Sequence, residues 1–145
     1  MKILIQRVSR ASVEIDKQKV AAIKKGALVF VGFDPQDSLK EIKKLSKKLL
    51  NYKIFSDVNG RINLSIVESK YEILLIPQIT LSVNTKKGLV PSFSQAANHE
   101  EGLLLFKQLT EHLIEEYSKV KTGTFGADMS IELINEGPIT FLFES

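Results

Sequence analysis

The chain has 145 residues, of which 43% are hydrophobic and 26% are charged, as in a typical soluble globular protein and unlike a disordered or membrane-spanning one. It contains no cysteine, which excludes a disulfide framework, a thiolate nucleophile and a Cys-ligated metal site. This length predicts a single domain over residues 1–145, with a core large enough to be stable without a disulfide or a structural metal. The first residues show no secretory signal, so the cytoplasm is the expected compartment, with no membrane contact.

The first third of the chain predicts strands. The segment KILIQRVSRASVEI alternates apolar and polar residues, a polar turn follows at DKQ, and KVAAI runs back. The apolar run ALVFVGF then predicts a central strand that is covered on both faces.

The segment DSLKEIKKLSKKLLNYKIF predicts an amphipathic helix with Ser38 or Asp37 as its N-cap. Five residues at helical spacing are expected to face inward, namely Leu39, Ile42, Leu45, Leu49 and Tyr52. The lysines of this segment then lie mainly on its outward face, where together with Lys53 they number six. Such a patch suits a phosphate backbone, or it is a solvated helix face, and charge alone does not separate the two. Smaller clusters occur at Lys24-Lys25 and Lys86-Lys87.

Turn signals divide the middle of the chain. Asn59-Gly60 predicts a tight turn between two short extended pieces. The segment YEILLIPQITLSV predicts an apolar strand, in which Pro77 indicates an edge, a bulge or a break. The loop over residues 84–97 is polar and long enough to suggest a functional role.

A second helix is predicted to begin after Asn98, which with Glu101 approximates a capping box. Its expected inward residues are Leu105, Leu109, Leu113 and Tyr117. Two strands, FGADMSIELI and PITFLFE, are expected to close the chain, joined by NEG. This order of elements lacks the regular alternation of a doubly wound fold and predicts the α+β class.

The usual signatures of side-chain catalysis are missing from the sequence. The two histidines, His99 and His112, do not form the pair that binds zinc on one helical face, and neither a metal nor a cofactor is expected. There is also no nucleophile elbow and no phosphate-binding glycine loop before a helix. An enzyme built on this sequence would need another source of chemistry.

The remaining candidates are Gln78 and Thr80 in PQITL, the FGADM stretch, and the pair Gly137-Pro138. Each also has a purely structural interpretation, because threonine suits a strand, the phenylalanine and methionine of FGADM suit a core, and Gly-Pro suits a turn.

Together these motifs resemble those of the D-aminoacyl-tRNA deacylases. The resemblance covers the whole chain, through ILIQRVSRASVEI, NYKIFSD, NGRINLS, PQITL, VPSFS and FGADM to NEGPITF, and the last motif is the most specific. It implies a mainly antiparallel sheet that forms a barrel-like core with two amphipathic helices. It also implies hydrolysis of the ester that links a D-amino acid to tRNA, by a homodimer whose active sites lie at the interface.

The resemblance implies roles for single residues as well. Gly137 and Pro138, joined by a cis peptide bond, would enter the partner's active site as a wedge that checks chirality. Arg7 would hold this loop in its orientation. Since glycine offers no side chain to exclude, we also expect some hydrolysis of glycyl-tRNA.

At the reacting centre, Gln78 and Thr80 would stand where backbone N–H groups and the threonine hydroxyl stabilise the oxyanion. The 2′-hydroxyl of the terminal adenosine would assist, which explains the missing base. The pocket for the adenosine and the aminoacyl group would be lined by Phe125, Ala127 and Met129.

Two positions depart from the family pattern. Pro77 stands where serine is usual, which excludes a serine nucleophile there, and Val90 stands where arginine is common. Pro77 and the lysine-rich helix motivate one alternative, a catalytically silent tRNA-binding dimer. A second alternative is a related deacylase with a trans Gly-Pro pair and relaxed chirality, against which Arg7 argues.

Overall fold

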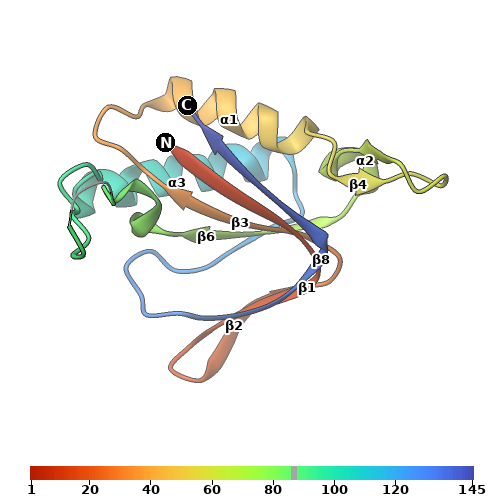
Figure 1. The fold of residues 1–145 in the computed structure, drawn as a ribbon, viewed down its shortest axis with the longest axis horizontal. Helices are drawn as coiled ribbons and strands as arrows, with labels where there is room; N and C mark the ends of the chain where they lie inside the picture. The colour runs from red at the N-terminus through yellow and green to blue at the C-terminus, as the bar shows by residue number, and fades with distance from the viewer. Residues whose placement is uncertain (86–87) are drawn as a thin grey trace.

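The structure, a computed structural model, describes residues 1–85 and 88–145. Its main sheet has six strands: β1 (Lys2–Ile15), β2 (Gln18–Ile23), β3 (Gly26–Gly32), β6 (Glu72–Pro77), β7 (Val120–Thr122) and β8 (Ser130–Glu144). Five of them lie in the order β2-β1-β3-β6-β7, and β8 pairs with β1 (Figure 1). As the apolar run predicts, β3 is a central strand, and six of its seven residues are buried.

The sheet is mainly antiparallel and strongly curled. The long strand β1 pairs antiparallel with β2, β3 and β8, whereas β3–β6 and β6–β7 are parallel. At the two ends of the strand order, Lys121 Nζ on β7 donates a hydrogen bond to the carbonyl of Ala22 on β2 at 2.6 Å. The predicted α+β class with a barrel-like sheet and two long helices is therefore confirmed.

The first long helix is α1 (Leu39–Asn51), and Ser38 is its N-cap in a full capping box with Glu41. Ile42, Leu45 and Leu49 are buried as predicted. The prediction is wrong for Leu39, which is 50% exposed because it is the first helical residue and lies beyond the core. It is also wrong for Tyr52, which follows the helix, is 38% exposed and packs edge-on against aromatic rings of β8.

The second long helix is α3 (His99–Glu116), in which Asn98 caps the N-terminus by accepting a hydrogen bond from the Glu101 N–H at 2.9 Å. Leu105, Leu109 and Leu113 are buried as predicted. The two long helices lie on the same side of the sheet (Figure 1), and their apolar faces join β1, β3 and β6 in the larger hydrophobic core.

A small hairpin follows α1 in the chain and projects beyond the end of this helix (Figure 1). Strands β4 (Phe55–Ser56) and β5 (Ile62–Leu64) pair across the turn predicted at Asn59-Gly60, where Gly60 has φ +77°. The short helix α2 (Ile66–Ser69) follows; the sequence analysis did not predict it, although Ser65 and Glu68 form its capping box.

Two strand predictions are wrong in their extent. β6 ends at Pro77, and the chain turns into the 3-10 helix η1 (Ile79–Ser82), so Thr80 is not a strand residue. The FGADM stretch is a loop, and the two strands expected at the C-terminus are one strand, β8, which contains Gly137-Pro138.

Two sequence features remain to be placed in the structure, namely the Lys86-Lys87 cluster and any membrane-spanning helix. The Lys86-Lys87 cluster lies outside the described residues. Within residues 1–85 and 88–145, no helix is long and apolar enough to cross a membrane.

Candidate functional site

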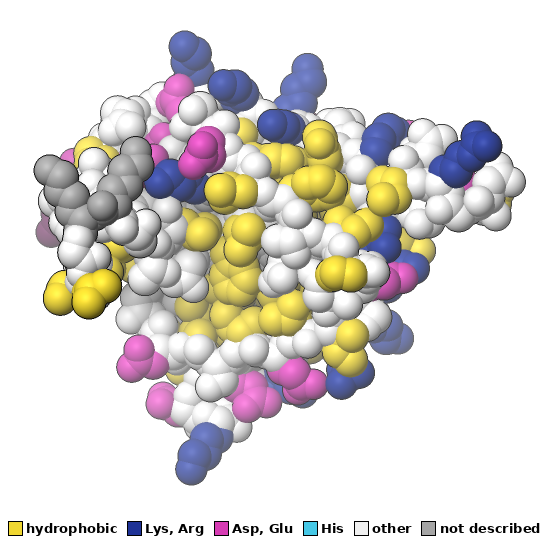
Figure 2. Space-filling model, in the orientation of Figure 1, with side chains coloured by type: hydrophobic (Ala, Val, Ile, Leu, Met, Phe, Trp, Pro, Cys, Tyr) yellow, Lys and Arg dark blue, Asp and Glu magenta, His cyan; other side chains and the backbone are white. Residues whose placement is uncertain are grey.

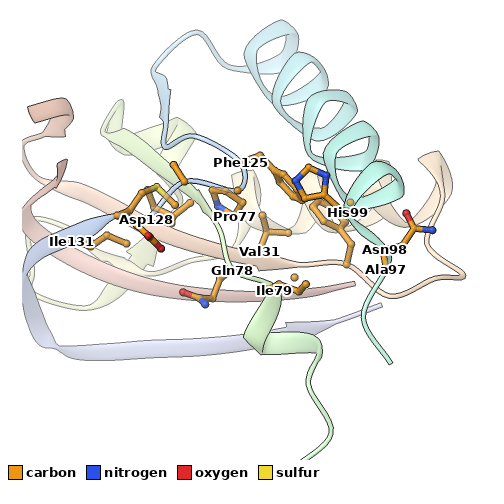
Figure 3. A pocket seen from close by; sticks show the side chains of 17 residues that line it. Val31, Pro77, Gln78, Ile79, Ala97, Asn98, His99, Phe125, Asp128 and Ile131 are labelled. Atoms are coloured by element: carbon orange, nitrogen blue, oxygen red, sulfur yellow. The ribbon is translucent and has the colours of Figure 1, made fainter. Parts of the chain in front are cut away.

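A cavity of about 440 Å³ opens where β3 and β6 end (Figure 3). Its walls come from the last residues of β3, from Pro77 at the end of β6 and Gln78 after it, from the first turn of α3, and from the loop before β8. Four residues singled out in the sequence line it, namely Gln78, Phe125, Ala127 and Met129. Four segments spread over about one hundred residues of the chain therefore converge on one cavity.

Phe125 forms the wall of the cavity that faces α3. Its ring lies edge-on to His99, with centroids 5.4 Å apart, and tilted against Phe106 at 5.9 Å. A Cβ atom on Gly102 would lie only 2.9 Å from the ring tip, Cζ. Helix α3 thus brings its backbone close to Phe125 because residue 102 has no side chain.

Two further glycines shape the loop before β8. A Cβ on Gly123 would lie 2.7 Å from Met129 Sδ and 2.9 Å from Ile76 Cδ1. Gly126 has φ +76°, a conformation that side chains disfavour, and a Cβ there would lie 3.2 Å from His99 Nε2. The loop therefore takes a path that needs glycine at both positions.

The PQITL motif stands at the rim of the cavity. Gln78 lines it, and the backbone N–H of Gln78 already donates to the Val31 carbonyl at 2.7 Å. Its side-chain Nε2 donates to Thr80 Oγ1 at 2.5 Å. Thr80 itself is exposed and does not line the cavity. Since its oxygen accepts the amide hydrogen bond, the Thr80 hydroxyl can donate its hydrogen to another group.

The Gly137-Pro138 pair sits in an exposed bulge of β8, and its peptide bond is cis. Pairing with β1 passes from Asn135, opposite Val8, to Thr140, opposite Gln6, so residues 136–139 oppose Arg7 alone.

Two side chains hold this bulge. Arg7 is 9% exposed; its Nε donates to the Glu136 carbonyl at 3.1 Å and its Nη1 to the Ile54 carbonyl at 2.8 Å. The amide of Asn135 closes the loop by bonding both backbone groups of Ile139, at 3.0 Å and 3.1 Å. The sequence analysis missed Asn135, although an Asx residue just before a Gly-Pro turn is itself a turn signal.

The cavity and the bulge are separate within one chain. Arg7 pairs with Ala27 on β3, while the cavity is lined by residues 31–33 at the far end of that strand. At about 3.3 Å per residue the separation along β3 is roughly 13–20 Å. One chain therefore does not bring its own Gly137-Pro138 pair to its own Gln78.

Other cavity residues were not singled out as site residues in the sequence, notably Asn98, His99 and Asp128. The sequence contains one signal for this part of the site. A glycine in a helix interior costs about 1 kcal/mol relative to alanine, so Gly102, three residues after His99 on the same helix face, indicates a position where the helix needs to avoid a side chain. Of the described residues in the loop over 84–97, which was expected to be functional, Ala97 alone lines the cavity, and Val90 is 81% exposed and not among the lining residues.

Two of the lowered pKa values belong to ion pairs outside this cavity. A hydrogen bond from Lys53 holds the pKa of Glu68 at about 2, and one from Lys121 lowers the pKa of Glu72. Among the described residues, no group of three His, Cys, Asp or Glu side chains is placed to hold a metal ion.

Relatives with curated names resemble the chain over its full length. A protein of Pseudomonas aeruginosa (strain LESB58) named D-aminoacyl-tRNA deacylase is 46% identical over 145 residues, which are 100% of both chains. One of the same name from Shewanella sp. (strain MR-4) is 44% identical over 138 residues, 95% of each chain.

Solved structures resemble the fold as closely. A structure titled "c-Myc DNA Unwinding Element Binding Protein" has a TM-score of 0.96 at 35% identity and covers 100% of this chain and 99% of its own. Another, titled "Structural Analysis of a probable eukaryotic D-amino acid tRNA deacylase", has a TM-score of 0.85 at 20% identity, covers 98% and 97%, and shows the fold alone.

The family described as D-Tyr-tRNA(Tyr) deacylase matches residues 4–144. The chain belongs to the D-Tyr-tRNA(Tyr) deacylase family and is, as the sequence predicts, an enzyme of the hydrolase class.

Proposed function

We propose that residues 1–145 act as one domain that hydrolyses the ester of D-aminoacyl-tRNA, as a chirality check in translation. The observation that carries this proposal is the cavity that gathers Gln78, Phe125, Ala127 and Met129 from distant segments, in a member of a deacylase family. A volume of about 440 Å³ falls in the range of small-molecule sites, which is about 300–1,000 Å³. The terminal adenosine with its aminoacyl group is of that size class.

In this proposal Thr80 supplies the hydroxyl that stabilises the developing oxyanion. Gln78 supports the role, because its amide occupies the Thr80 oxygen as acceptor and leaves the hydroxyl hydrogen to donate. The Gln78 backbone N–H is not a candidate donor, since it is engaged with Val31. Thr80 is exposed in the single chain, so its hydroxyl becomes effective only when substrate and a partner subunit exclude water.

Pro77 decides which nucleophile is available. Proline has neither a hydroxyl nor a backbone N–H, so the residue before Gln78 contributes no nucleophile and no donor. We therefore assign the assisting role to the 2′-hydroxyl of the substrate's terminal adenosine and the attack to water.

A variant pair tests this centre. Thr80→Val keeps the shape and removes the hydroxyl, and it should lower kcat for D-tyrosyl-tRNA by about 10²-fold. Thr80→Ser, which keeps the hydroxyl, should retain most of the rate. Equal activity of Thr80→Val and wild type would refute the role of Thr80.

We further propose a homodimer in which each subunit inserts Gly137-Pro138 into the cavity of its partner. The pair is exposed and is roughly 13–20 Å along the sheet from the cavity of its own chain. Strands β1 and β8 lie toward the viewer in Figure 1, and on this face of the molecule hydrophobic side chains gather at the centre (Figure 2). On β8, Ile134 and Leu142 are 42% and 54% exposed in the single chain, as expected for apolar residues that a partner subunit covers.

The cysteine-free chain allows a clean test of this arrangement. Pro138→Cys and Gln78→Cys variants, mixed under mild oxidation, should give a disulfide-linked dimer joining the two different variants. Each variant alone is the control for chance cross-linking. A mixture that links no better than the single variants would refute the inserted pair.

Such a wedge would select between D- and L-substrates by steric contact with the backbone of Gly137-Pro138. It blocks the direction that an L side chain takes and makes no demand on the D side chain, so broad D specificity and hydrolysis of glycyl-tRNA follow. Glycyl-tRNA that survives enzyme concentrations which strip D-tyrosyl-tRNA would refute steric exclusion as the basis of selection.

Two alternatives have distinct outcomes. A silent tRNA-binding dimer, favoured by Pro77 and the lysine-rich helix, would bind tRNA and cleave no ester. A deacylase with relaxed chirality would cleave L-tyrosyl-tRNA as well as the D-ester.

A further inference from the structure

Helix α1 carries the positive charge of the whole molecule. It holds five lysines and one glutamate, a charge of +4, in a chain whose net charge is +3. The rest of the chain has 15 Lys and Arg against 16 Asp and Glu, which leaves it at −1. All five lysines of α1 are exposed, namely Lys40, Lys43, Lys44, Lys47 and Lys48.

These charges are not neutralised within the described chain. None of the five ammonium groups has an ion pair with a carboxylate of the described residues. Glu41, the only acid of the helix, is bound to the N-cap, where Ser38 Oγ and N–H donate to it at 2.6 Å and 3.0 Å. The Ser38 hydrogen bond also lowers the pKa of Glu41, which keeps it charged and in place.

One lysine is held by an aromatic contact, and the others are free to meet a ligand. Lys48 Nζ lies 4.2 Å from the ring centroid of Phe143. Lys43, Lys44 and Lys47 recur at three- and four-residue spacing beside the buried Leu45 and Leu49, so they share the outward face. Figure 2 shows basic side chains along the edge of the molecule that α1 forms in Figure 1.

The helix begins beside the cavity. Phe33 lines the cavity, its carbonyl accepts a hydrogen bond from the Ala97 N–H at 2.9 Å, and residues 34–38 lead directly into α1. From there the thirteen residues of α1 extend the basic face by about 20 Å away from the cavity. A nucleic acid whose 3′ end enters the cavity would therefore have the phosphates on the 5′ side of its last nucleotide within reach of this helix.

We propose that the outward face of α1 is the docking surface for the phosphate backbone of the tRNA whose 3′ end occupies the cavity. This inference rests on the proposed function. The surface recognises phosphates and not sequence, so it serves many tRNAs alike, and its contribution falls as salt rises. Anionic membrane is the other polyanion that such a face could meet, but the adjoining cavity favours RNA.

The test compares two triple variants that remove the same charge. K43Q/K44Q/K47Q alters α1, and K17N/K19Q/K24Q alters exposed lysines outside α1. Lys17 and Lys19 belong to the β1–β2 hairpin, which lies on the side of the molecule away from α1 (Figure 1), and Lys24 directly follows β2. Each is assayed at 0.1 M salt on D-tyrosyl-tRNA and on the minimal ester D-tyrosyl-adenosine, which lacks the phosphate backbone.

The α1 variant should lose kcat/KM on D-tyrosyl-tRNA by on the order of 10²-fold, because each lost phosphate contact costs roughly 5–8-fold at this salt concentration. It should cleave D-tyrosyl-adenosine like wild type, and the hairpin variant should cleave both. No loss on tRNA, or equal loss in both variants, would overturn the proposal.

A binding measurement separates this proposal from the proposed function. If wild type cleaves neither ester, the proposed function fails, and the salt dependence of tRNA binding still tests α1. Three lost contacts should lower the slope of log K against log salt by about 2–3 for the α1 variant only. An unchanged slope, or a variant that loses binding to anionic phosphatidylserine vesicles but not to tRNA, would overturn it.

Discussion

Replacing Arg7 by lysine should loosen the Gly137-Pro138 bulge without removing the positive charge. The guanidinium of Arg7 bridges two carbonyls, Glu136 O at 3.1 Å and Ile54 O at 2.8 Å, with nitrogens fixed in one plane. A lysine ammonium is a point donor on a flexible stem and serves only one of them. Arg7 is 9% exposed, so the abandoned carbonyl is not well compensated by water.

The magnitude follows from the lost bond. A hydrogen bond to a charged group contributes about 1.5–3 kcal/mol, and Arg7→Lys should lower the free energy of unfolding by that amount. Urea denaturation measures this change. Since about 1.4 kcal/mol corresponds to a factor of ten, we expect the ratio of kcat/KM for D- and L-tyrosyl-tRNA to fall about tenfold.

The matched control is Glu136→Gln. Arg7 holds the backbone carbonyl of Glu136, whereas the nearer Glu136 carboxylate oxygen is 3.9 Å from Arg7 Nε, so this variant should keep the D/L ratio. An Arg7→Lys protein that is less stable but discriminates as well as wild type would refute the link between Arg7, the bulge and chirality.

Three other variants test the remaining parts of the account. Gly102→Ala would ordinarily stabilise a helix by about 1 kcal/mol, but its Cβ would lie 2.9 Å from Phe125 Cζ, so Tm should not rise and kcat/KM should fall roughly tenfold. Adding Phe125→Leu to this variant relieves the contact, so it should raise Tm, but it should not restore kcat/KM. Asn135→Leu, which removes both bonds to Ile139, should lower the D/L ratio in the same assay as Arg7→Lys, and an unchanged ratio would count against the clamp. Glu68 has a pKa of about 2, below its usual 4.5, so its contribution to stability is present above about pH 4.5 and is lost as pH falls toward 2. Glu68→Gln should therefore lower Tm at pH 7 and leave Tm unchanged near pH 2.

The elements that follow from local pattern were predictable. Ser38 and Asn98 cap the two long helices because their side chains satisfy backbone N–H groups next to them in sequence. The Asn59-Gly60 turn and the buried strand β3 likewise depend on residues close together in the chain.

What the sequence did not predict depends on contacts between distant segments. The residues of FGADM suit a strand and predict one, but Phe125 is held in a loop by packing against α3 at Gly102. The bulge in β8 has the same origin, since it forms opposite Arg7, about 130 residues earlier in the chain. The separation of the cavity from the bulge likewise emerges only from the register of β1 with β3.

The most direct test is a side-by-side deacylation time course of wild-type protein with D-tyrosyl-tRNA and L-tyrosyl-tRNA. The account predicts rapid loss of the D-ester while the L-ester decays at the rate seen without enzyme. Equal stability of both esters would contradict the account in favour of a silent RNA-binding protein, and loss of both would contradict the chirality check.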